Sequence, residues 1–99
     1  MDFSQIQRLS PQLLEIAQKH GILKIYVFGS VARGDHSLKS DVDLLVEMQE
    51  DASLFGLAGF NYEAESLLGV PVDVVPLSVL PRIRDQEYAI NIQKEAVPL

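Results

Sequence analysis

The chain has 99 residues, enough for one domain with a single core but too few for a catalytic domain and a separate substrate domain. Its hydrophobic share of 47% and charged share of 22% are typical of a folded globular protein and exclude a disordered tail. The net charge of -6 argues against strong non-specific binding to nucleic acid, and the lack of Cys excludes disulfides and thiolate zinc sites.

The first element predicted is a helix. Ser10 followed by Pro11 is a good helix start, and the apolar spacing that follows runs to a stop at Gly21. Residues 2–9 are expected to form an earlier helical turn of the same arm. A short buried strand is predicted over residues 23–28, where β-branched and aromatic residues end at a glycine.

The middle of the chain predicts a turn, a loop and a second strand. Residues 30–33 have the length of one helical turn, which Ser30 would cap. Residues 34–40 form a polar loop, and residues 41–47 are predicted to be a strand. The two strands are therefore joined by a wide connection of about a dozen residues.

The second half of the chain predicts a helix, a strand and a further helical segment. Apolar residues at roughly helical spacing predict a helix over residues 53–68. Its Leu54, Leu57, Phe60 and Leu68 are interpreted as core, with a partner surface as the alternative for some of them. Residues 70–75 are predicted to be a strand, at a sheet edge or beginning just after Pro71. Residues 77–96 are predicted to be helical with a break or start at Pro81.

No targeting or membrane segment is expected. Residues 1–5 lack the basic start and apolar stretch of a signal peptide, and no apolar run approaches the roughly 18 residues of a membrane span. We therefore expect a cytoplasmic protein without a membrane partner. The acidic charge is also compatible with a basic protein partner.

Two carboxylates at alternate positions of a predicted strand are the strongest chemical signal. Asp41 and Asp43 point to one face because strand side chains alternate, and they repel each other unless a positive charge lies between them. Mg²⁺ is usually held by one or two carboxylates together with substrate phosphates. A second ion at about 3.5–4 Å needs a further carboxylate, for which Asp73 is the candidate. Whether one or two ions bind stays open.

The turn after the first predicted strand suits a phosphate group. Gly29 permits close backbone approach, and Ser30 begins a helical turn whose N–H groups could face an anion. Arg33, one turn further on, adds charge for the same phosphates, although a salt bridge within the protein explains it nearly as well.

Simpler interpretations apply to several other polar residues. Asp35 and His36 are expected to be exposed loop residues, and His20 a cation at a helix end without a further role. Glu63 and Glu65 do not share a helical face and are interpreted as surface charge. An Asp-x-Asp pair alone is more often a solvated face than a metal site, but the glycine turn and the third acid favour metal. A calcium loop is rejected because its sixth-position glycine is missing.

Two stretches of the chain resemble a known family. They are FGSVARG over residues 28–34 and SDVDLLV over residues 40–46. Together they look like the signature of the DNA polymerase beta-like nucleotidyltransferase superfamily, and the short length is similar to that of its minimal nucleotidyltransferase (MNT) proteins. The resemblance covers about residues 11–76.

The resemblance implies a fold and roles for six residues. The fold expected is α+β, a small mixed sheet with helices mainly on one face and the acids at an open edge, like the polymerase beta palm, with residues 1–99 forming one minimal nucleotidyltransferase domain. By resemblance, Mg²⁺ and the chemistry would be assigned to Asp41, Asp43 and Asp73, and ATP phosphates to Gly29 and Ser30, with Arg33 as a further candidate.

The resemblance also implies an activity and a partner. Many minimal members are encoded beside a HEPN-domain toxin and act as antitoxins, some by moving AMP from ATP to a tyrosine of that partner. Two alternatives remain: a module that neutralises its partner by occlusion without catalysis, and a nucleotidyltransferase acting on a small molecule. The oligomeric state is not determined by the sequence.

Overall fold

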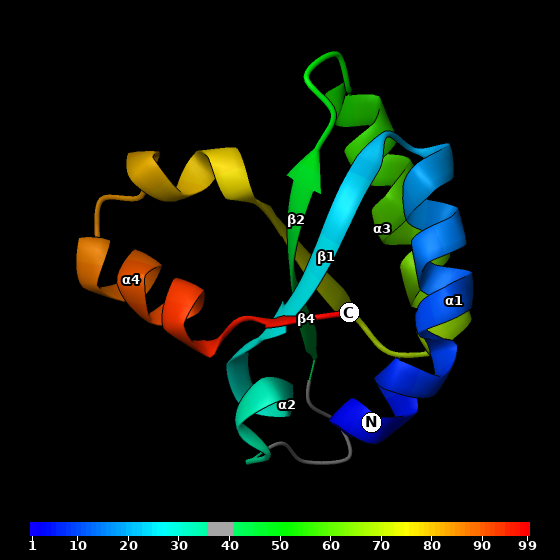
Figure 1. The fold of residues 1–99 in the computed structure, drawn as a ribbon, viewed down its shortest axis with the longest axis horizontal. Helices are drawn as coiled ribbons and strands as arrows, with labels where there is room; N and C mark the ends of the chain where they lie inside the picture. Colours follow the sequence, from blue (N-terminus) through cyan, green and yellow to red (C-terminus); the bar gives the residue numbers. More distant parts are fainter. Residues whose placement is uncertain (36–40) are drawn as a thin grey trace.

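A computed structural model describes residues 1–35 and 41–99 of the chain. Figure 1 shows a mixed sheet between two groups of helices. The elements in chain order are α1 (Phe3–Lys19), β1 (Ile22–Phe28), α2 (Gly29–Arg33), β2 (Val42–Met48), α3 (Leu54–Leu68), β3 (Val72–Pro76), the 3-10 helix η1 (Leu77–Arg82), α4 (Gln86–Glu95) and β4 (Val97–Pro98). The strand order is β3-β2-β1-β4, and only the β2–β3 pair is parallel.

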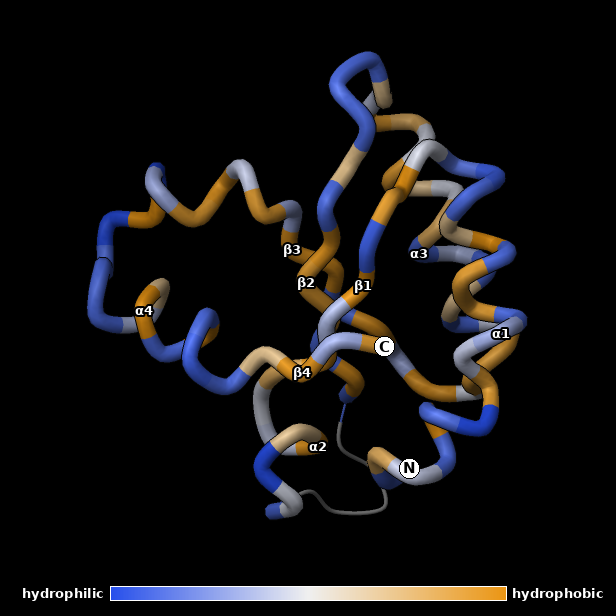
Figure 2. The backbone as a smooth tube through the Cα atoms, viewed as in Figure 1, coloured by the Kyte–Doolittle hydropathy of each residue, from blue (hydrophilic) through white to orange (hydrophobic). Residues whose placement is uncertain are grey.

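The sheet separates a larger core from a smaller one. The larger core lies between the sheet and the helices α1 and α3, and it includes Val42, Leu44 and Val46 of β2. The smaller core lies on the opposite face, where Phe28 and Leu45 pack with residues of η1 and α4. Figure 2 shows hydrophobic residues along the central strands and hydrophilic ones at the turn after β2. The predicted α+β fold with a small mixed sheet is confirmed, but helices lie on both faces, α1 and α3 on one and η1 and α4 on the other.

Helix α1 is longer than the sequence predicted. It begins after Asp2, whose carboxylate accepts the backbone N–H of Gln5 in a capping box, and it continues through Pro11. The predicted start at Ser10 is therefore wrong. A proline leaves the carbonyl four residues earlier, that of Gln7, without a partner, but both residues are exposed, so water can bind that carbonyl.

Two glycines of α3 allow it to pack closely against the end of α1. A Cβ atom on Gly56 would lie 2.7 Å from the main-chain oxygen of His20, and one on Gly59 would lie 2.6 Å from the His20 ring. The ring in turn contacts the carboxylate of Glu63, which also pairs with Lys19 at 2.6 Å. The interpretation of His20 as a helix-end cation without a further role, and of Glu63 as surface charge, is therefore wrong, because their contact joins two helices.

We expect Gly56→Ala to lower the free energy of unfolding by about 1–2 kcal/mol. Alanine gains about 1 kcal/mol in helix propensity, but overpacking against a backbone oxygen, which cannot rotate away, costs about 2–3 kcal/mol, in the upper part of the usual range. Gly59→Ala is the matched control, because the atoms in its way belong to a side chain that can rotate. Urea unfolding of both variants tests this, and a Gly56→Ala variant as stable as the parent chain would contradict it.

The first turn of α3 is exposed, contrary to the predicted core position of Leu54. Leu54 is 81% exposed and Phe55 is 90% exposed, whereas Phe60 and Leu68 are buried as predicted. Helical spacing did not distinguish them because apolar residues occur on more than one side of α3. Within the described residues, no helix is both long and apolar enough to cross a membrane.

Candidate active site

Strand pairing brings Asp43 and Asp73 together. The parallel register places Asp43 opposite Asp73, and the antiparallel register places Phe28 on the other side of Asp43. Because Val42 and Val72 point into the larger core, Asp43 and Asp73 point to the opposite face of the sheet, toward α4. Their shared face and strand pairing are confirmed, and β3 is an edge strand. Their catalytic roles stay predictions.

The position of β3 is fixed by two polar side chains of α3. The Asn61 amide donates to the carbonyl oxygen of Val72 at 2.7 Å, and the Val72 N–H donates to Glu65 at 2.8 Å. Glu65 is therefore not the surface charge that the sequence indicated. These two bonds hold the residue that precedes Asp73 and so help to position its carboxylate.

The Asp43 carboxyl group binds its proton more tightly than a free carboxyl. Burial raises the pKa of Asp43 to about 6, and the neighbouring charges of Asp73 and Asp41 and a hydrogen bond with Asp73 add to the shift. Arg33 opposes it and lowers the pKa. Three carboxylates thus share a region in which negative charge is unfavourable.

This acidic region fits a divalent cation that arrives with a substrate. Asp43 and Asp73 face each other, and the exposed Asp41 immediately precedes β2. Within residues 1–35 and 41–99, no three His, Cys, Asp or Glu side chains form a ready cation site. Mg²⁺ needs only one or two carboxylates when phosphates and waters complete its shell, and it would relieve the repulsion that raises the Asp43 pKa.

The structure gives Gly29 a role that the sequence did not show. Its φ of +76° lies in the left-handed region, and a Cβ atom there would overlap the Asp43 carboxylate and lie 3.1 Å from its Cγ. Gly29 therefore makes room for Asp43. Helix α2 begins at Gly29 and has no side-chain cap, so the predicted capping role of Ser30 is wrong. Ser30 instead lines the cleft described below.

Arg33 is held by two acidic side chains. Its Nη1 atom lies 3.0 Å from Glu95 of α4, and its Nε atom lies 3.1 Å from Asp35. These contacts raise the pKa of the Arg33 guanidinium. Of the two sequence interpretations, the structure shows the salt bridge, and phosphate binding by Arg33 stays a prediction. Asp35 is exposed as expected, and His36 lies outside the described residues.

A cleft of about 370 Å³ opens where β1 leads into α2 and faces α4. The lining residues are Phe28, Gly29, Ser30, Arg33, Asp43, Tyr88, Asn91, Ile92 and Glu95. The four from α4 were missed by the sequence analysis. Their spacing of three, one and three residues indicates one helical face, but no sequence pattern shows which surface that face meets.

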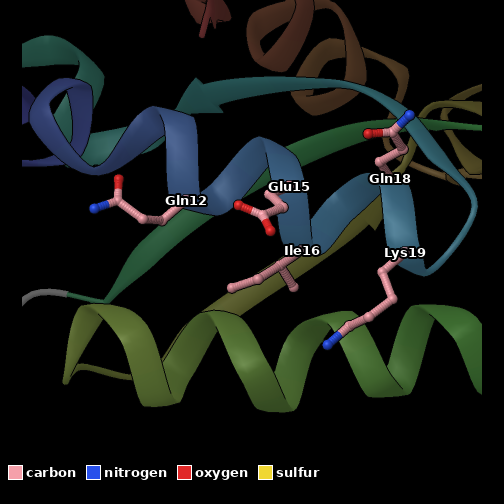
Figure 3. A pocket seen from close by; sticks show the side chains of 5 residues that line it. All are labelled: Gln12, Glu15, Ile16, Gln18 and Lys19. Carbon is pink, nitrogen blue, oxygen red and sulfur yellow. The ribbon is translucent and has the colours of Figure 1, made fainter.

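A second hollow lies along α1, on the other side of the sheet. Figure 3 shows its lining side chains, with Lys19 reaching toward α3. The residues are Gln12, Glu15, Ile16, Gln18 and Lys19. This hollow has no pair of acids and no glycine turn, and its Lys19 is paired with Glu63. The cleft beside Asp43 is therefore the candidate active site.

We expect Asp43→Asn to raise the melting temperature at pH 7.5 in a chelator. The carboxyl pKa is about 6 when folded, against 3.8 for the free group. The ionised carboxylate therefore opposes folding above pH 6, and this cost disappears below the unfolded pKa, where both states are protonated. The gain should shrink as the pH falls from 6 to 4.

Thermal unfolding with and without Mg²⁺ measures both effects. Mg²⁺ should raise the melting temperature of the parent chain at pH 7.5. The melting temperature of the Asp43→Asn variant should stay almost unchanged, because the variant lacks the Asp43 carboxylate that would hold the ion. A variant that is less stable than the parent at pH 7.5 in the chelator would contradict this interpretation of the carboxylate cluster.

Comparisons with known proteins identify the family of this chain. The family described as "Nucleotidyltransferase domain" matches residues 9–99. The chain is 38% identical over 87 residues to a protein of Methanocaldococcus jannaschii provisionally named protein adenylyltransferase MJ0435, covering 87% of this chain and 90% of that protein. It is 41% identical over 66 residues to protein adenylyltransferase MntA of Thermococcus cleftensis, covering 67% of each.

Solved structures show the same fold. A structure provisionally described as a minimal nucleotidyltransferase superposes with a TM-score of 0.81 at 34% identity, over 100% of this chain and 97% of that one. A toxin–antitoxin structure with AMP-PNP superposes with a TM-score of 0.68 at 19% identity, over 89% of this chain and 69% of that one. A structure of a tri-AMPylated Shewanella oneidensis HEPN toxin in complex with MNT antitoxin superposes with a TM-score of 0.63 at 17% identity, over 93% of this chain and 69% of that one. The last two similarities show the fold alone.

Proposed function

Since the chain belongs to the nucleotidyltransferase domain family, we propose that it transfers AMP from ATP to a tyrosine hydroxyl of a HEPN-type toxin and so acts as an antitoxin. Residues 1–99 would work as a single minimal domain, in the cytoplasm where ATP is available. The observation that carries this proposal is Asp43, which lines the cleft and lies opposite Asp73 of the neighbouring strand.

The carboxylates account for the need for a cation. Asp41 and Asp43 would hold Mg²⁺ together with the ATP phosphates, and Asp73 would share the site. When bound, such an ion would supply positive charge that offsets the triphosphate and the charge developing on the leaving group. The raised pKa of Asp43 supports this assignment because burial, and after it the charges of Asp73 and Asp41, disfavour the ionised carboxylate that a cation would stabilise.

The transfer step follows from these positions. The tyrosine hydroxyl oxygen forms a bond to the α-phosphorus as the bond between that phosphorus and the bridging oxygen of the β-phosphate breaks. Pyrophosphate leaves, and Asp73 takes the hydroxyl proton. Arg33 would exchange Glu95 for a phosphate oxygen, which keeps its charge paired throughout.

An exposed apolar surface supports a protein partner. Leu54 and Phe55 are 81% and 90% exposed at the start of α3, and Tyr62 lies exposed two turns further along the same helix. Exposed apolar patches commonly mark protein interfaces. The acidic Glu50 and Asp51 precede this surface, so a partner with basic residues around an apolar contact would fit it.

Co-expression with a HEPN-type protein encoded next to this chain tests the proposal. The parent chain should restore growth, and mass spectrometry of the purified partner should find AMP on a tyrosine. Asp43→Asn should bind the partner but neither modify nor neutralise it. Neutralisation by this variant without modification would instead establish occlusion, and transfer undiminished by the substitution would overturn the mechanism.

A further inference from the structure

One face of α4 forms a wall of the cleft. Tyr88, Asn91, Ile92 and Glu95 are spaced so that they share a helical face, and all four line the cleft. Ile92 is buried in the smaller core and anchors the helix to the sheet. Its three polar neighbours are left to face the open space, so this wall is available to a ligand.

The two ends of this wall differ in chemistry. At one end Glu95 pairs with Arg33, close to where Gly29 and Asp43 meet. At the other end Tyr88 and Asn91 present an aromatic ring and a carboxamide. The seven-residue step from Tyr88 to Glu95 corresponds to roughly 10 Å along a helix. The first end suits phosphates, and the second suits an uncharged, planar group.

At the second end, the backbone is held in place, while the polar groups of Tyr88 and Asn91 point to no partner within the described residues. The Asp85 carboxylate caps α4 by accepting the N–H of Tyr88 at 3.1 Å, which fixes the backbone beneath the ring. The Tyr88 ring is 52% exposed. Within the described residues, neither the Tyr88 hydroxyl nor the Asn91 amide makes a hydrogen bond to another side chain or to the backbone.

We propose that Tyr88 and Asn91 form the nucleoside subsite of the cleft, with a purine base stacked on the Tyr88 ring and read by the Asn91 amide. This inference rests on the proposed function, because it requires a nucleoside triphosphate as donor. One edge of a carboxamide presents an N–H donor beside the acceptor oxygen, which match N7 and the amino group of adenine. Guanine has two acceptors at the same edge, so Asn91 favours adenine.

Binding of Mg²⁺–ATP, Mg²⁺–GTP and Mg²⁺–tripolyphosphate, measured by calorimetry, tests the subsite. Tripolyphosphate has the phosphates of ATP without the nucleoside. Tyr88→Ala should weaken the binding of ATP about tenfold, because the ring on which the base stacks is lost. The affinity for tripolyphosphate should stay unchanged. Tyr88→Phe should keep ATP affinity, because the ring remains. Asn91→Ala should reduce the preference for ATP over GTP by about tenfold.

Ile90→Ala is the matched control on the same helix. Ile90 is 49% exposed and does not line the cleft, so its removal should change no affinity. Equal ATP affinity in the parent, Tyr88→Ala and Asn91→Ala would overturn the subsite, as would an equal loss for ATP and tripolyphosphate. In either case AMP transfer by the parent would leave the proposed function standing. A parent chain that binds neither compound would overturn both.

Discussion

Asp43→Asn is expected to lower the rate of AMP transfer by on the order of a thousandfold. The carboxylate lies between Asp73 on the neighbouring strand and Gly29 at the start of α2, where it would hold Mg²⁺ against the triphosphate. Loss of such charge stabilisation is worth several kcal/mol, and each 1.4 kcal/mol is about tenfold in rate. Single-turnover transfer at saturating ATP measures the effect.

Glu47→Gln provides the matched control for this substitution. It makes the same chemical change on the same strand, at a partly exposed residue whose one ion pair, with Lys24, is long at 4.0 Å. We expect its transfer rate to stay within about twofold of the parent, because isolated surface pairs contribute little. Equal losses in the two variants would show that charge on β2, rather than the Asp43 position, determines the rate.

Gly29→Ala is expected to reduce both stability and transfer. Alanine at a positive φ costs about 1–2 kcal/mol, and its Cβ would displace the Asp43 carboxylate, which adds an overpacking cost of about 1–3 kcal/mol. We expect unfolding to become easier by about 3 kcal/mol. Transfer should fall by about a hundredfold, as for other small misplacements of catalytic groups.

Gly34→Ala separates the backbone cost of a positive φ from the displacement of the Asp43 carboxylate. Gly34 has a similar φ of +81°, but no atom of residues 1–35 and 41–99 that could obstruct a side chain lies within 4 Å of its Cβ position. It should therefore show the backbone cost of about 1–2 kcal/mol alone and keep normal transfer in the folded fraction. Urea unfolding and transfer assays on both variants decide the matter. Equal transfer by the two alanine variants would contradict the role given to Gly29.

The sequence predicted the part of the site that depends on strand periodicity. Alternation along residues 41–47 predicted the shared face of the acids, and the isolated Asp73 in an apolar run predicted a neighbouring strand. The β2–β3 register confirms the pairing of the two strands and places Asp43 opposite Asp73, whereas Asp41 precedes β2 and its shared face with Asp43 stays a prediction. Local patterns were sufficient here because the two-residue period of a strand directly determines which side chains share a face.

The wall formed by α4 could not be predicted in the same way. A helical spacing groups Tyr88, Asn91 and Glu95 on one face, but the packing of η1 and α4 across the second face of the sheet determines what that face meets. The close contact between Gly29 and Asp43 was missed for the same reason, because it joins α2 to β2, two elements that are not contiguous in the sequence. Long-range packing determined both the surface that α4 faces and the contact between Gly29 and Asp43.

The identity of the transferred group tests the central claim most directly. ATP labelled on either the α- or the γ-phosphate is incubated with Mg²⁺, this chain and a purified HEPN-type partner. The account predicts that the α-label stays on a partner tyrosine, that the γ-label leaves in pyrophosphate, and that Asp43→Asn transfers neither. Transfer of the γ-label to the partner, or retention of the α-label in the Asp43→Asn reaction at the parent rate, would contradict it.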